Sequence, residues 1–186
     1  MKLYITYRKT SSLSMRIDKK YDVRVSAPIG YPKEEIMKFL ESKKDWIKEA
    51  RQRRYEQEKK RYEFFNQLPL DTEVEFRAAV NRLFDIVSPL VKKYSELMGL
   101  ETPFYRCGTT ISKWGSCDAR NGVVQFSIYL LLLPDWCIEH VVVHELAHLI
   151  EPNHSPRFYA IMDKYFPRWR EARAETRRIS RMEVEE

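Results

Sequence analysis

The sequence lacks the features that mark secreted, redox-active and membrane-spanning proteins. Its three cysteines, Cys107, Cys117 and Cys137, form no C-x-x-C pair that would indicate a metal knuckle or a redox motif. No apolar run reaches the ~18 residues needed to span a bilayer, and the start, MKLYITYRKT, has no apolar core of a signal peptide. We therefore expect a cytoplasmic protein with reduced cysteines and no membrane partner.

The length, composition and net charge of the chain exclude few classes of function. The chain has 186 residues, of which 44% are hydrophobic and 13% aromatic, as in a globular protein of one domain or one domain with a small appendage. The net charge of +6 is compatible with nucleic acid or another acidic partner but does not require one.

Histidine is also scarce, and its distribution is the most informative feature of the sequence. All 4 histidines lie between positions 140 and 154. The apolar stretch from Asp135 to Ile150 predicts a helix, with Pro134 before its start and Pro152 beyond its end. His144 and His148 are four residues apart and share one face of that helix, so both imidazoles can bind one metal ion.

Glu145 completes an H-E-x-x-H pattern. It follows the first histidine and lies roughly 100° around the helix, beside the pair of ligands. In this pattern the two histidines hold zinc and the glutamate acts on the water at the metal. A water on zinc can lose a proton near pH 7, and Glu145 is the predicted base that takes it.

His154 is the favoured third ligand. Pro152 disfavours helical geometry at Glu151, so the first helix should stop there. Ser155-Pro156 has the character of an N-cap followed by the first residue of a new helix. His154 is therefore held between two helix ends, six residues after His148, which is the offset in the extended H-E-x-x-H-x-x-G-x-x-H pattern.

The sequence also allows other residues as metal ligands. Glu171 or Glu175, on a later helix, could supply a distant carboxylate, and Glu151 is a weaker candidate. His140 continues the face of His144 upstream. A fourth protein ligand would close the open position that a catalytic zinc needs, so we favour a packing or supporting role for His140.

The N-terminal third predicts strands followed by a charged helix. Residues 1–26 alternate in polarity like strands, with a polar turn at 18–22, which predicts a small β-meander. A helix follows from about Pro32 and can continue through RQRRYEQEKKRYEFF at 51–65. The mixed charges favour a solvated helix, with a basic nucleic-acid surface as the alternative.

The remainder predicts helices around a hairpin. An amphipathic helix is expected over 73–98, with Gly99 at its end. Two antiparallel strands joined through 118–122 should follow, the second continuing through Leu130. A strand edge beside a zinc helix can pair with an extended peptide. Beyond the metal helix, one helix is expected over 156–165 and another from Pro167.

Three motifs in order carry a family resemblance. With WGSC at 114–117, VVVHELAHL at 141–149 and NHSPRF at 153–158, the chain resembles the YgjP-like metallopeptidase family and, more distantly, SprT and WLM proteins. The resemblance implies an α+β fold: a zincin-like core with the H-E-x-x-H helix beside a small antiparallel sheet, plus the N-terminal meander and long helices. We expect two parts that pack as one unit: residues 1–66, with the N-terminal meander and the charged helix, and a zincin-like metallopeptidase domain over 67–186.

By position, the resemblance assigns a zinc-dependent peptidase site. The metal ligands would be His144, His148 and His154, and the base would be Glu145, which agrees with the spacing argument. Candidates for substrate binding are Trp114, Ser116 and Tyr159, although Trp114 could instead support the metal helix. Candidate donors to an oxyanion are Tyr159, Tyr129 and Arg157.

Three hypotheses for function follow. The leading one is a zinc metallopeptidase that cleaves a peptide or protein substrate. The second is a nucleic-acid-associated module whose zinc site is a tethered protease or a scaffold. The third is a structural zinc protein, which would require a fourth ligand such as His140 or Cys117.

Overall fold

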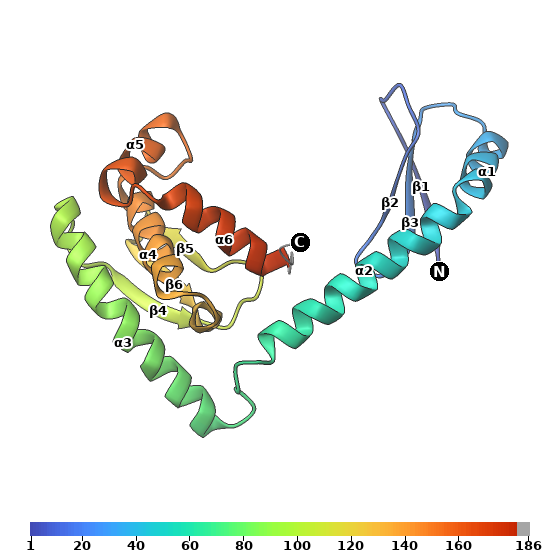
Figure 1. Ribbon diagram of the computed structural model, residues 1–186. Coiled ribbons are helices and arrows are strands. Elements are labelled where there is room, and N and C mark those ends of the chain that lie inside the picture. Colours follow the sequence, from blue (N-terminus) through green and yellow to red (C-terminus); the bar gives the residue numbers. More distant parts are fainter. Residues whose placement is uncertain (182–186) are drawn as a thin grey trace. The chain divides into compact units, whose positions relative to one another are not determined.

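The computed structural model describes residues 1–181, and the acidic end, 182–186, lies outside the described residues. The chain divides into two compact units, Met1–Lys60 and Arg61–Glu186. The described residues form six α-helices and two three-stranded sheets, so the predicted α+β class is confirmed (Figure 1). Among the same residues, no helix has both the length and the hydropathy of a membrane span.

The N-terminal sheet differs from the predicted meander. Its strands are β1 (Leu3–Arg8), β2 (Ser14–Ile17) and β3 (Val23–Pro28), in the order β1-β3-β2. The β2–β3 pair is antiparallel, as a meander requires, but β1 pairs with β3 in parallel. The strand with the most buried side chains, β3, takes the centre, where Val23 and Val25 are covered on both sides.

Two helices follow, where the sequence suggested one that continues. Helix α1 (Lys33–Ser42) ends at Lys43, and α2 (Lys44–Phe65) begins directly afterwards. Ile36 of α1 is fully buried in the small core under β3. In α2, Arg53 pairs with Glu49 at 3.2 Å and Arg54 with Glu58 at 3.4 Å. Much of the positive charge of α2 is therefore neutralised within the helix.

The second unit opens with helix α3 (Glu73–Met98), whose ends match the prediction. Thr72 and Glu75 form a capping box in which each side chain accepts a hydrogen bond from the backbone N–H of the other residue. Gly99 ends the helix in the left-handed conformation, at φ 68°.

The second sheet has the order β4-β6-β5 and is mixed. Strands β5 (Gly115–Asp118) and β6 (Val123–Ser127) form the predicted antiparallel pair, while β4 (Phe104–Gly108) joins β6 in parallel and was not predicted. The predicted continuation of β6 through Leu130 is wrong. Ser127 accepts a hydrogen bond from the Tyr129 N–H and starts the 3-10 helix η1 (Ile128–Leu132).

Helix α4 (Asp135–Ile150) forms the centre of the second unit, with the predicted bounds. It packs against α3, β5, α5 (Pro156–Tyr165) and α6 (Trp169–Arg181) (Figure 1). Its apolar residues belong to one continuous core with those of α3, the sheet, α5 and α6. The edge strand β5, paired with β6 on one side, lies beside this helix.

Candidate active site

Three histidine side chains converge at the C-terminal half of α4. The Nε2 atom of His144 lies 3.2 Å from Nε2 of His148 and 3.1 Å from Nε2 of His154. One ring nitrogen of each histidine lies within 4.8 Å of the others. The structure therefore brings together the three histidines that the sequence singled out.

Local helix signals hold His154 against the other two. Helix α4 ends at Ile150, and the next residue, Glu151, is extended, at φ −135° and ψ 101°. Pro152 disfavours helical geometry at that residue. Helix α5 begins at Pro156, where the Ser155 hydroxyl accepts a hydrogen bond from the Phe158 N–H. The short linker leaves His154 little freedom. The Phe158 ring packs against all three imidazoles, with ring centroids 4.6 to 4.9 Å apart.

The geometry fits a metal ion of the size of zinc. Two nitrogens bound to a tetrahedral zinc, each about 2.0–2.1 Å from it, are roughly 3.4 Å apart. The two short distances from His144 Nε2 are close to this value. His148 Nδ1 lies 3.2 Å from the Glu151 carbonyl oxygen. If Nδ1–H donates there, the Nε2 lone pair of His148 is free for a metal.

The electrostatics of the cluster favour neutral imidazoles. Burial, followed by the charges of the neighbouring histidines and Arg173, lowers the pKa of His144 to about 3. Burial also lowers the pKa of His148. Metal ligation requires unprotonated histidine, so this environment favours the binding form at neutral pH.

Glu145 lies beside the histidines and against the edge strand. It is 6% exposed, and burial raises its pKa to about 8, partly opposed by the charge of Lys113. A Cβ atom on Gly115 would lie 2.6 Å from Glu145 Oε1 and 2.7 Å from its Cγ. Only glycine at this position lets the strand approach the carboxylate so closely. The sequence analysis missed this role of Gly115, although the glycine stands within the WGSC motif.

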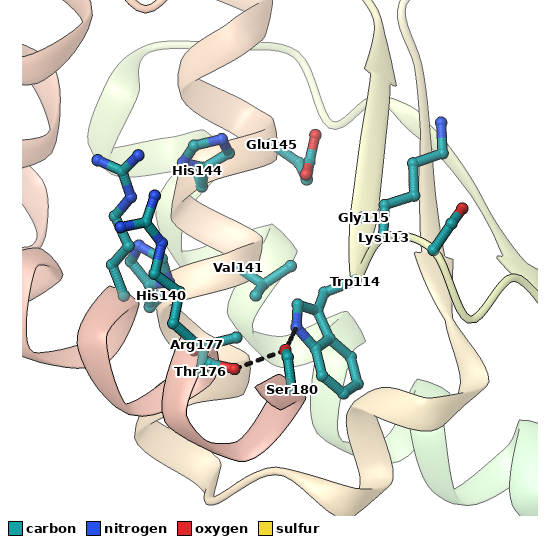
Figure 2. Close-up of a pocket in the computed structure, with 12 residues that line it drawn as sticks. Lys113, Trp114, Gly115, His140, Val141, His144, Glu145, Thr176, Arg177 and Ser180 are labelled. Atoms are coloured by element: carbon teal, nitrogen blue, oxygen red, sulfur yellow. Dashed lines mark hydrogen bonds between the residues drawn. The ribbon is translucent and has the colours of Figure 1, made fainter. Parts of the chain in front are cut away.

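Two cavities adjoin this centre and share Gly115, His144 and Glu145. The first, of ≈ 370 Å³, extends from Trp114 to α6, and Figure 2 shows residues of its wall. The second, of ≈ 750 Å³, extends along β5 to His148 and His154. Together they form a depression along the edge strand that passes the buried carboxylate.

The substrate-binding candidates lie in different places. Trp114 lines the first cavity and donates a hydrogen bond from Nε1 to Ser180 Oγ at 3.2 Å. Ser116 lines the second cavity. Tyr159 is outside both linings, and its ring stacks on Trp169 with centroids 4.9 Å apart. The other two candidate donors to an oxyanion, Tyr129 and Arg157, are also outside both linings.

The alternative ligands lie outside the cluster. Glu171 pairs with Arg168 at 2.9 Å, and Glu175 pairs with Arg178 at 2.7 Å. The Glu151 carboxylate accepts a hydrogen bond from the Asn153 N–H.

The two candidates for a fourth ligand also lie apart from the three histidines. The His140 ring centroid is 5.8 Å from that of His144, and Cys117 is half-buried in the second cavity. Among residues 1–181, the metal-capable group at this site consists of the three histidines, without His140 or Cys117.

Comparison with known proteins assigns the family. The sequence matches the family described as YgjP-like, metallopeptidase domain, over residues 11–82 and 77–179. The chain belongs to this family. It is therefore a metallopeptidase-type, metal-dependent hydrolase. A comparison with curated proteins found no match.

Two solved structures are similar to part of the chain. The metallopeptidase zymogen abylysin of Pyrococcus abyssi is 24% identical, with a TM-score of 0.45 over 49% of this chain and 93% of its own. The metallopeptidase zymogen jannalysin of Methanocaldococcus jannaschii is 16% identical, with a TM-score of 0.41 over 50% of this chain and 88% of its own.

Proposed function

We propose that the protein is a zinc-dependent peptidase whose metal is held by His144, His148 and His154. The convergence of the three imidazole nitrogens carries this proposal. The described part of the chain offers these three ligands and no fourth, next to two cavities. This arrangement supports a metal with an open position for water, as catalytic zinc requires, over a closed structural site.

Zinc bound there would supply a Lewis acid and lower the pKa of a bound water toward 7. We assign Glu145 the role of general base. A zinc ion beside it would favour the ionised form of this carboxyl group, which burial alone disfavours. The carboxylate would accept a proton as the water attacks the scissile carbonyl and would then deliver a proton to the leaving nitrogen. The close approach of the strand at Gly115 limits the room around the carboxylate, and burial keeps most of its surface from bulk water.

The edge of β5 supports an extended peptide as the substrate. In the sheet order β4-β6-β5, this strand pairs with β6 and has a second edge for hydrogen bonding. A substrate strand added there would pass both cavities and Glu145. Backbone pairing would hold the peptide, while Trp114 in one cavity and Ser116 in the other would contact its side chains.

The test is the Glu145→Gln variant, assayed on casein or another unfolded protein. Glutamine is similar in shape to glutamate but cannot accept the proton. We expect the variant to keep its zinc and bind peptide while hydrolysis slows by roughly 10²- to 10⁴-fold. Zinc content and cleavage are measured on the same preparation. A zinc-loaded variant as fast as the wild type would remove Glu145 from the mechanism.

A further inference from the structure

The first cavity has a strongly positive wall. Lys113 from the segment before β5 and Arg173 and Arg177 from α6 all line it. Figure 2 shows Arg177 reaching from α6 past His140 toward His144, and Lys113 on the strand side. Apart from Glu145, no carboxylate among residues 1–181 lines this cavity. The three cations therefore surround a space next to the reaction centre.

These cations differ from their neighbours on and near α6. Arg168 pairs with Glu171, Arg170 with Asp163 at 2.7 Å, and Arg178 with Glu175. Within residues 1–181, by contrast, Lys113, Arg173 and Arg177 make no ion pair. Arg173 and Arg177 are four residues apart on one helix face, where like charges repel. An anion in the cavity would relieve that repulsion.

The wall also contains an unsatisfied polar side chain. His140 is 6% exposed, and neither of its ring nitrogens has a hydrogen-bond partner among the described residues. It lines the same cavity as Arg173 and lies one turn before His144 on α4. A buried imidazole without a partner is unfavourable, because it has lost water and gained no hydrogen bond. A polar ligand in this cavity could supply the missing partner.

The second cavity has no such bias. Its ionisable surface groups include Asp118 as well as Arg120, so its charges offset each other. The difference between the two cavities predicts selectivity on one side of the cleaved bond. Guanidinium pairs suit a carboxylate in particular, because their N–H donors match its two oxygens.

We propose that the cavity formed by Lys113, Arg173 and Arg177 is a subsite that binds a carboxylate of the peptide substrate. This inference rests on the proposed peptidase function. Antiparallel pairing is slightly more stable than parallel pairing, and a peptide paired in this way with β5 would run from Asp118 toward Gly115 and then toward Lys113. The carboxylate therefore lies on the C-terminal side of the cleaved bond. It belongs either to an aspartate or glutamate side chain or to the free C-terminus of a short peptide.

Matched peptides test the subsite. Cleavage sites in an unfolded protein are first mapped with zinc-loaded enzyme, and one site is then made as peptides with Glu or Gln just after the cleaved bond. A second pair ends two residues after that bond as a free acid or an amide. We expect the preferred carboxylate to raise kcat/KM by about tenfold or more, as for a charge-assisted hydrogen bond. The pair that shows the difference identifies the source of the carboxylate.

The variant Arg173→Gln/Arg177→Gln should abolish this preference. Its kcat/KM should fall toward that of the neutral peptide, while cleavage of the neutral peptide stays within about twofold and zinc content is unchanged. Arg170→Gln removes the same charge from α6 outside the cavity and should preserve the preference. Equal cleavage of both peptides in both pairs by the wild type would overturn the subsite but leave the peptidase function standing.

Measurement of peptide binding distinguishes failure of the subsite proposal from failure of the proposed peptidase function. Fluorescence anisotropy with the same labelled peptides measures affinity for zinc-loaded Glu145→Gln, which need not cleave them. If the wild type hydrolyses nothing, unstructured peptides of one arbitrary sequence that differ only in Glu or Gln, or in a free or amidated C-terminus, replace them; tighter binding of a carboxylate peptide that is lost with both arginines would then support the subsite alone. Equal affinity for all the peptides would overturn it.

Discussion

Helices α2 and α4 carry their polar residues in opposite ways. In α2 the charged side chains are mostly exposed, and Arg53 and Arg54 each have a glutamate one turn away. In α4 the surroundings are apolar, yet two histidines and a buried glutamate sit in its C-terminal half, facing a third histidine. Polar groups that an exposed helix holds at little cost are expensive inside a core.

This difference shows that the position of a polar side chain, buried or exposed, indicates whether it has a functional role. A charge in water gives little information, because exposed pairs contribute about 0–1 kcal/mol and tolerate change. A polar cluster held in a core must be compensated by a ligand, a partner or a chemical role. The arginines of α6 differ in pairing rather than in burial: Arg170 and Arg178 pair with carboxylates, whereas Arg173 and Arg177 are exposed and line the first cavity. We therefore expect changes at the buried polar groups around α4 to have larger effects than changes at the exposed charges of α2.

The largest effect is expected from His154→Ala. Removal of a residue that only hydrogen-bonds to a metal ligand typically weakens metal binding by roughly 10–100-fold. Removal of one of the three ligands themselves should weaken zinc binding by more than this. Glu171→Ala is the control, because its carboxylate pairs with Arg168 away from the cluster. Zinc per chain, measured by elemental analysis after dialysis, should fall in the first variant and stay near one in the second. Equal zinc in His154→Ala and the wild type would end the three-histidine hypothesis.

A smaller effect is expected from Gly115→Ala. The added methyl group would overlap the Glu145 carboxylate and push it aside. We expect zinc to be retained and kcat to fall by about tenfold or more, since small displacements of a catalytic group are costly. Gly108→Ala is the matched control in the same sheet, where the new methyl group meets the movable end of Gln125. Similar activity in both variants would show that the close approach at Gly115 does not matter.

The smallest effect is expected from α2. Reversing the charge of Arg53 and Arg54 breaks one exposed pair and one half-buried pair, each of which contributes about 0.2–0.5 kcal/mol. The free energy of unfolding should therefore change by less than about 2 kcal/mol, allowing for the new repulsion, and zinc content should not change. Chemical denaturation and elemental analysis measure both. Loss of zinc would contradict the contrast between the two helices.

The nucleic-acid hypothesis is tested with the same helix. If α2 binds DNA or RNA, the affinity should fall steeply with salt, because each neutralised phosphate releases counterions. Reversal of charge at Arg51, Arg53 and Arg54 should then abolish binding. No binding by the wild type at low salt would reject the hypothesis.

Features encoded by neighbouring residues could be predicted from the sequence. The bounds of α4 and α3 follow from prolines, a capping box and Gly99, all within a few residues of the helix ends. The closeness of His144 and His148 follows from the helical period. Their approach to His154 follows from a linker too short to lead elsewhere. The family resemblance and the metal-binding candidates therefore rest on local signals.

The other features of the fold and the site depend on contacts between residues that are far apart in the sequence. The parallel pairing of β1 with β3 and the position of β4 depend on strands that are distant in sequence, for which no local pattern exists. Gly115 meets Glu145 only because β5 packs against α4. Arg173 and Arg177 look like the other arginines of α6 in sequence. Only the packing of that helix on α4 puts these two beside the reaction centre, because contact between faces depends on the whole core.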